Sequence, residues 1–124
     1  MSVDNLPVLT IGDLKVSPPI VQGRMGVRVS RANLASAVAS QGCVGVIASV
    51  GLGRFEHLPR SEAVRVNEEA LRHEIQQARR QTNGIIGVNV MVALTDYENH
   101  VRASVDENVD LIISGAGLPL NLPK

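Results

Sequence analysis

The sequence predicts an α/β fold built on a parallel sheet. Four apolar runs recur along the chain, at Ile20–Gln22, Val44–Ala48, Ile85–Val92 and Leu111–Ile113. Runs that are apolar at successive positions are typical of strands buried on both faces, and segments of helical periodicity separate them here. The order is a hairpin followed by β-α-β-α-β-α-β. This order and its regular spacing suit a barrel and a doubly wound sheet equally.

The first elements follow from local signals. The segment Leu9–Val16 alternates apolar and polar residues around a Gly-Asp pair, which predicts a hairpin. Ser30 has a side chain suited to capping a helix from Arg31 to Gln41. Gly42 then stands where a left-handed residue ends many helices. The small residues of this helix favour close packing on a sheet.

The next two helices are predicted from their caps. Ser49–Val66 is rich in glycine and charge, and we expect a long loop there. Asn67 is expected to cap the second helix, which ends before Asn83-Gly84. Thr95–Glu98 has the form of a capping box and predicts a third helix that runs to about Asn108.

Composition narrows the function classes. The 124 residues are 44% hydrophobic and 2% aromatic, with a formal net charge of zero. Neither a basic stripe for nucleic acid nor an aromatic stacking surface is present. The single cysteine cannot form an internal disulfide, and no apolar run approaches the ~20 residues of a membrane span. We expect a cytoplasmic protein that contacts neither nucleic acid nor membrane, and no metal site.

In parallel α/β folds, ligands bind at the carboxyl ends of the strands. Small or polar residues follow every predicted strand there: Gln22 to Gly26 after the first, Ser49, Gly51 and Gly53 after the second, and Ser114, Gly115 and Gly117 after the fourth. Glycines allow a flat ligand to approach the backbone closely. Asn89 interrupts the third apolar run, and a buried amide needs hydrogen-bond partners. It is therefore the most informative polar residue for a ligand site.

The histidines do not form a cluster. His73 and His100 fall on the polar faces of predicted helices, where we expect both to be solvated. His57 falls in the long loop after the second strand. No spacing indicates a metal site, a nucleophile–base pair or a phosphate-binding loop, so no catalytic residue is assigned.

Three stretches together resemble a known family. They are Pro19-Ile20-Val21-Gln22-Gly23-Arg24-Met25-Gly26 followed by Val29-Ser30, then Gly84-Ile85-Ile86-Gly87-Val88-Asn89-Val90-Met91, and then Asp110-Leu111-Ile112-Ile113-Ser114-Gly115-Ala116-Gly117-Leu118-Pro119. In this order they resemble the nitronate monooxygenases, also called 2-nitropropane dioxygenases. The same superfamily includes the flavin-dependent enoyl-acyl-carrier-protein reductases.

The resemblance implies the first half of an FMN-binding (β/α)₈ TIM barrel, with the hairpin, four parallel strands and three helices in residues 1–124. It implies cofactor-binding roles for six residues: Gly23, Met25, Gly26, Asn89, Ser114 and Gly115. The implied activity is the oxidation of alkyl nitronates with oxygen. The alternatives are an enoyl reductase and a non-catalytic half-barrel that self-associates.

Two parts of the family pattern lie beyond this sequence. They are the catalytic histidine after the fourth strand and the phosphate loops after strands seven and eight. We therefore expect one partial domain whose remainder comes from a longer chain or another copy, with a homo-oligomer as one form. The 124 residues alone are expected to retain no FMN and to be inactive on a small-molecule substrate.

Overall fold

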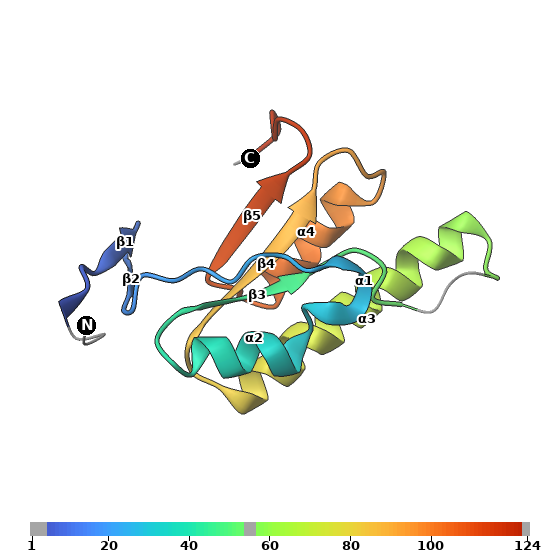
Figure 1. Cartoon of the computed structure of the whole chain (residues 1–124). Helices are drawn as coiled ribbons and strands as arrows, with labels where there is room; N and C mark the ends of the chain where they lie inside the picture. The colour runs from blue at the N-terminus through green and yellow to red at the C-terminus, as the bar shows by residue number, and fades with distance from the viewer. Residues whose placement is uncertain (1–4, 54–56, 123–124) are drawn as a thin grey trace.

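A three-stranded parallel sheet in the order β3-β4-β5 organises the chain (Figure 1). The computed structural model describes residues 5–53 and 57–122. The elements are β1 Leu9–Ile11, β2 Leu14–Val16, α1 Gly26–Val29, α2 Ala32–Ala39, β3 Val44–Ala48, α3 Arg60–Gln81, β4 Ile85–Met91, α4 Tyr97–Asp106 and β5 Leu111–Gly115. The order agrees with the predicted hairpin and alternation of strands and helices.

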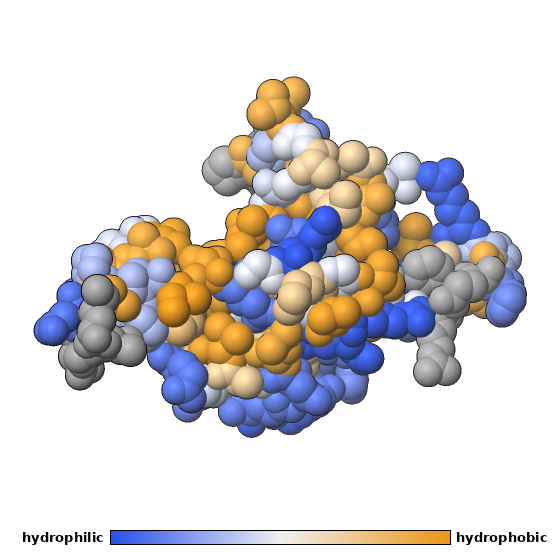
Figure 2. Space-filling view, viewed as in Figure 1, coloured by the Kyte–Doolittle hydropathy of each residue, from blue (hydrophilic) through white to orange (hydrophobic). Residues whose placement is uncertain are grey.

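The sheet has two apolar faces with different neighbours. On one face Ile47, Ile86 and Val88 pack against α2, α3 and α4 in the main core. On the other face Val44 and Val46 contact the hairpin, and α2, α3 and α4 do not cover that face. In the view of Figure 1, hydrophobic residues gather across the middle of the molecule (Figure 2). One face is thus a helix-covered core and the other is largely open.

The predicted hairpin is confirmed, and it lies at one end of the open face. β1 and β2 pair antiparallel, with Leu9 opposite Val16. Val16 is fully buried, and it packs with Ile85 and Leu111 at the amino ends of β4 and β5. The hairpin therefore lies at the amino ends of the strands, and their carboxyl ends lie away from it (Figure 1).

The first predicted strand, Ile20–Gln22, forms only a single parallel bridge, from Val21 to Val44. Two backbone hydrogen bonds support the bridge. Beyond it, the Gln22 side chain takes the place of further backbone hydrogen bonds to β3. Its Oε1 accepts the Val46 N–H at 3.0 Å, and its Nε2 donates to Ser30 Oγ at 3.3 Å. The segment thus lies beside β3 without regular strand pairing.

The prediction that Ser30 caps α2 is wrong. Ser30 Oγ instead accepts the Met25 backbone N–H at 2.9 Å, and the helix begins at Ala32. The Ala32 N–H donates to Glu74 Oε2 at 2.8 Å, and Arg31 pairs with the same carboxylate. A buried carboxylate from α3 therefore stabilises the amino end of α2, where negative charge is favoured.

The long loop predicted at Ser49–Val66 is too long, and Asn67 is not a helix cap. α3 begins at Arg60, directly after Pro59, so Asn67 lies within the helix and is 3% exposed. Proline suits the start of a helix because its fixed φ is compatible with one and a first-turn N–H has no helical partner. The polar composition of the first turns reflects exposure rather than a loop.

Two expectations for α4 are also wrong. Its first residue follows Asp96, which makes no side-chain capping bond, and Thr95 Oγ1 accepts from Arg60 instead. The predicted capping box is therefore absent. His100, expected in solvent, is fully buried between α4 and α3, whereas His73 is exposed as predicted. No helix in the described ranges is long and apolar enough to cross a membrane.

Close packing of α2 on the sheet depends on Gly45. A Cβ placed there would lie 1.9 Å from the Ala35 carbonyl oxygen, a backbone atom that cannot move away without displacing the helix. Gly45→Ala should lower the free energy of unfolding by about 1–3 kcal/mol or more because it overpacks this contact. Urea denaturation measures the change.

Gly23→Ala is the matched control, since a Cβ at Gly23 would meet nothing within 4 Å. It should leave the free energy of unfolding unchanged or slightly higher, as alanine restricts the unfolded chain. Equal losses from both variants would contradict the packing role of Gly45.

Candidate functional site

The carboxyl ends of β3, β4 and β5 meet at the uncovered part of the open face. Asn89 is paired in register with Ala48 on one side and Ile113 on the other. Met91 and Gly115 lie opposite each other two residues further along. Because alternate residues share a face, all five lie on the face away from the helices. Asn89 is thus the one polar side chain in this two-row patch.

The Asn89 amide has no hydrogen-bond partner among the described residues, although its backbone oxygen accepts the Ser49 N–H at 3.1 Å. The side chain is half-buried between apolar neighbours. A half-buried amide can donate two hydrogen bonds and accept two. It is therefore available to a ligand that presents both donors and acceptors.

The predicted glycines and Met25 surround this edge with accessible backbone. A Cβ at Gly23, Gly26 or Gly115 would meet nothing within 4 Å, so the space in front of each is open. The Met25 side chain is 49% exposed, and its backbone N–H is already bound to Ser30. These positions allow a planar group to lie against the chain.

Ser114 differs from the other predicted site residues. Its hydroxyl lies 3.3 Å from the Tyr97 hydroxyl, on the face that the helices cover. Its side chain therefore does not join Asn89, and only its backbone lies at the carboxyl edge. The structure brings Asn89, Gly115, Gly26 and Met25 to this edge and directs the Ser114 hydroxyl away from it.

A pocket of about 230 Å³ opens at the same edge. It is lined by Arg24, Gly26, Val27, Ala48, Val50 and Met91. Three of these residues belong to the segment after the first strand, two to the end of β3 and the loop that follows it, and one to β4. Its walls are mostly apolar, and Arg24 provides a positive charge at the rim. Such a lining suits a flat, largely apolar group with an anionic substituent nearby.

Two residues that the sequence analysis did not assign to the site, Arg28 and Asn67, hold the loop after β3. Arg28 donates from Nε to the Gly51 oxygen at 3.1 Å and from an Nη to the Gly53 oxygen at 2.9 Å. Its own backbone is left-handed, with φ 65°. Such strain persists where surrounding contacts fix it, and it is common near binding sites. Nothing local in the sequence indicates this role for Arg28.

Asn67 binds the same loop from the opposite side. Its Oδ1 accepts the N–H groups of Leu52 at 2.9 Å and Gly53 at 3.3 Å, and its Nδ2 donates to the Ser49 oxygen at 3.2 Å. Asn67 was detectable in the sequence as a polar residue next to a segment of helical periodicity. We interpreted it as the cap of that helix and not as a residue inside it. The loop is therefore fixed by one side chain on each side.

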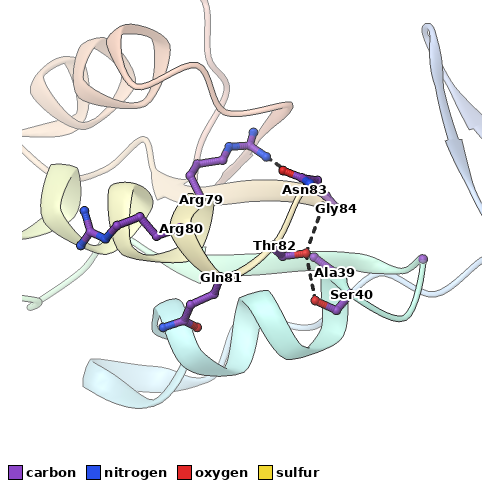
Figure 3. A pocket seen from close by; sticks show the side chains of 9 residues that line it. Ala39, Ser40, Arg79, Arg80, Gln81, Thr82, Asn83 and Gly84 are labelled. Atoms are coloured by element: carbon purple, nitrogen blue, oxygen red, sulfur yellow. Dashed lines mark hydrogen bonds between the residues drawn. The ribbon is translucent and has the colours of Figure 1, made fainter.

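A larger pocket, of about 520 Å³, lies at the amino ends of the strands (Figure 3). Its polar groups are largely paired with one another. Ser40 donates to Thr82 Oγ1, which also accepts the Gly84 N–H, and Arg79 donates to the Gly84 oxygen. Arg80 points away from this cluster (Figure 3). In TIM barrels the amino ends of the strands serve stability, whereas ligands bind at the carboxyl ends. We therefore assign the site to the carboxyl edge.

Within the described ranges, no group of three His, Cys, Asp or Glu residues is placed to hold a metal ion. The carboxyl edge also holds no histidine or carboxylate beside Asn89 in the register of the described strands. What the edge offers is one amide, open backbone and an apolar wall. This arrangement can bind and orient a group but does not itself supply an acid or base.

A comparison of two asparagines tests this description. Asn89→Ala should change the free energy of unfolding by less than about 0.5 kcal/mol, because no protein partner loses a bond. Asn67→Ala should cost at least about 2 kcal/mol, because it leaves buried backbone groups without partners. Urea denaturation of both variants decides the matter, and an Asn89→Ala loss as large as that of Asn67→Ala would refute a ligand-facing amide.

Known structures and families agree with this geometry. FabK from Thermotoga maritima, a TIM barrel, superposes with a TM-score of 0.63 and 28% identity, over 82% of this chain and 28% of that chain. A mutant of the same FabK gives a TM-score of 0.61 and 27% identity, over 82% of this chain and 29% of that chain. No curated protein sequence matches.

The chain therefore spans less than a third of the FabK chains that it resembles. The likeness confirms the predicted fold class, a partial (β/α)₈ barrel with its helices outside the sheet. The family model described as nitronate monooxygenase matches residues 9–118, which is most of the sequence. This chain belongs to the nitronate monooxygenase family.

Proposed function

We propose that the carboxyl edge of β3, β4 and β5 forms one wall of an FMN site in an oxidoreductase. The observation that carries the proposal is the unpartnered Asn89 amide in an apolar patch beside open backbone. The isoalloxazine ring of a flavin is planar, largely apolar on its faces and edged with donors and acceptors. Family membership supports the choice, since the nitronate monooxygenase family and FabK are flavin-dependent in general.

The residues present fit part of the cofactor. A pocket of about 230 Å³ is smaller than the roughly 300–1,000 Å³ of typical small-molecule sites, so it suits a ring system and not a whole nucleotide. Asn89 would bind the ring edge, and the backbone around Gly26 and Gly115 would lie against its face. In TIM barrels the phosphate is held by loops after strands seven and eight.

The flavin, when bound, supplies the redox chemistry. The protein residues then orient it and exclude water. Met25, Val27 and Met91 would provide the apolar wall, and the amide of Asn89 would fix the ring by its hydrogen bonds. We infer that the activity of the whole protein is the oxidation of alkyl nitronates with oxygen, because the family match is to nitronate monooxygenase.

The second candidate function is reduction of an enoyl thioester by a flavin-dependent enoyl-acyl-carrier-protein reductase. FabK is an enzyme of this kind, so the structural likeness to FabK favours this function. Enoyl reduction is as compatible with the family match as nitronate oxidation is. The wall formed by the described residues would serve both reactions, because in both the redox chemistry belongs to the flavin that the protein orients.

A third candidate is a non-catalytic half-barrel that associates with another copy. β5 is an edge strand, and Leu118 and Leu120 after it are 76% and 81% exposed. Unpaired edges promote such association. Sedimentation that finds a folded monomer would remove this candidate.

FMN binding is the first test of the proposal. In an NMR titration of the chain with FMN, the side-chain NH₂ of Asn89 and the amides of Gly26 and Gly115 should shift, while amides of the hairpin should not. Asn89→Ala should weaken binding by about tenfold, as expected for one lost hydrogen bond of about 1.4 kcal/mol. We expect weak binding that does not survive gel filtration.

Shifts confined to the amino-end pocket, or no shifts at millimolar FMN, would overturn the assignment of the flavin wall. Arg80→Ala, at the amino-end pocket on the opposite side of the sheet ends, is the control and should bind FMN as the wild type does. A preparation of this chain that stays yellow through gel filtration would show that the remaining barrel is not needed for retention.

Substrate class is tested on the whole flavin-loaded protein, because this chain alone is expected to be inactive. Alkyl nitronate should cause oxygen consumption. The flavin absorbance should fall as the flavin is reduced and return as oxygen reoxidises it. Consumption of a nicotinamide cofactor with an enoyl thioester, and none of oxygen with nitronate, would instead select the reductase function.

A further inference from the structure

Asn67 and His100 lie side by side in the interior between α3 and α4, and both are almost completely buried. Three of the four hydrogen bonds available to the Asn67 amide go to backbone groups of Ser49, Leu52 and Gly53. These residues form the loop that joins β3 to the segment before α3. One buried amide therefore sets the path of this loop.

The fourth hydrogen bond of Asn67 reaches His100. Its Nδ2 lies 2.7 Å from His100 Nε2. The orientation of the amide is fixed, because Oδ1 accepts two backbone N–H groups and Nδ2 must be the donor. Nε2 of His100 is then the acceptor, and the neutral ring carries its proton on Nδ1. Nδ1 is buried without a partner in the described part of the chain.

A second group faces the same ring nitrogen. Asp96 Oδ2 lies 3.1 Å from His100 Nε2. A carboxylate gains a hydrogen bond there only if Nε2 carries a proton, whereas Asn67 needs Nε2 without one. The two contacts therefore require opposite protonation states of His100. Only one of them can be a good hydrogen bond at a time.

The surroundings set which state prevails. Burial is the largest influence and lowers the pKa of His100, while the carboxylates of Asp96 and Glu68 raise it. Arg72 pairs with Glu68 at 2.9 Å and offsets its charge, and the loop after β3 presents backbone groups and the Ser49 hydroxyl. The neutral ring, bonded to Asn67, is therefore the state near neutral pH.

We infer that Asn67 and His100 are positioning residues for the loop after β3, and that protonation of His100 releases this loop. On protonation, Nε2–H donates to Asp96 and repels the Nδ2–H of Asn67. The Asn67 amide must then turn, and Leu52 and Gly53 lose its oxygen. Since Val50 of this loop lines the carboxyl-edge pocket, the inference rests on the proposed flavin site for its functional meaning.

The sign of the pH dependence follows from the same states. Below its ordinary pKa of 6.5, the unfolded chain binds a proton on His100 that the folded chain resists. Stability therefore rises with pH up to about that value and is lost as pH falls through it. Loop release should follow protonation of the ring in the folded chain, whose pKa lies below the ordinary value.

The tautomer of His100 is the first measurement, and it needs no variant. The ¹⁵N shifts of the ring at about pH 7.5 should show Nδ1 protonated and Nε2 not, the less common form of free histidine. On acidification the ring should titrate below the ordinary histidine range. A ring protonated on Nε2 at neutral pH would overturn the inference.

Amide exchange measures the loop itself. As the pH is lowered from about 7.5 through the pH at which the His100 ring is seen to titrate, the protection factors of Leu52 and Gly53 should fall about tenfold, corrected for intrinsic exchange. Ala48, whose N–H is bound to the Ser30 oxygen, is the internal control and should not change. Constant protection of the loop during the titration would contradict the inference.

Two variants separate positioning from simple packing. His100→Gln keeps an amide oxygen that accepts from Asn67 and cannot titrate, so loop protection should be retained and become independent of pH. His100→Leu fills the space without an acceptor, so protection should be low at every pH. Wild-type pH dependence in His100→Gln would overturn the inference.

FMN affinity then links the loop to the site. Acidification should weaken FMN binding in the wild type and not in His100→Gln. If no variant binds FMN, the proposed flavin function fails, whereas the tautomer and exchange measurements still decide whether His100 positions the loop.

Discussion

The parallel sheet must be covered on both apolar faces, and the rest of the structure depends on that constraint. Three helices cover one face through a core that includes Ile47, Leu71 and Ile75. On the other face, within the described residues, the hairpin packs against the sheet at the amino ends of the strands. The remaining apolar area, with Asn89 in it, surrounds the carboxyl edge. The same lack of cover therefore leaves this face incompletely buried and makes it accessible to a ligand.

The helices approach the sheet closely because small residues stand at the contacts. Gly45 meets the backbone of Ala35, and Gly84 meets that of Ala39. At both places a side chain would have to occupy space filled by main-chain atoms. Such contacts leave α2 little freedom, and the α1 segment before it is directed toward the carboxyl edge (Figure 1).

Buried polar groups join elements that are distant in the sequence. Gln22 binds β3, Glu74 binds the first turn of α2, and Asn67 binds the loop after β3. Each satisfies backbone groups that would otherwise lose water without compensation. At the start of α2, the contact from Glu74 replaces the local cap expected from Ser30. His100 is part of the same system, and its two competing partners make it sensitive to a proton.

The sequence by itself determined the order of the elements, the hairpin and the three paired strands. These follow from apolar periodicity and turn residues, which act over a few positions. Tertiary structure decided the start of α3, the burial of His100, the turn of Ser114 toward Tyr97 and the roles of Arg28, Glu74 and Asn67. Those outcomes depend on which distant backbone groups need a partner once the layers pack. No local pattern specifies that need, because it exists only in the folded chain.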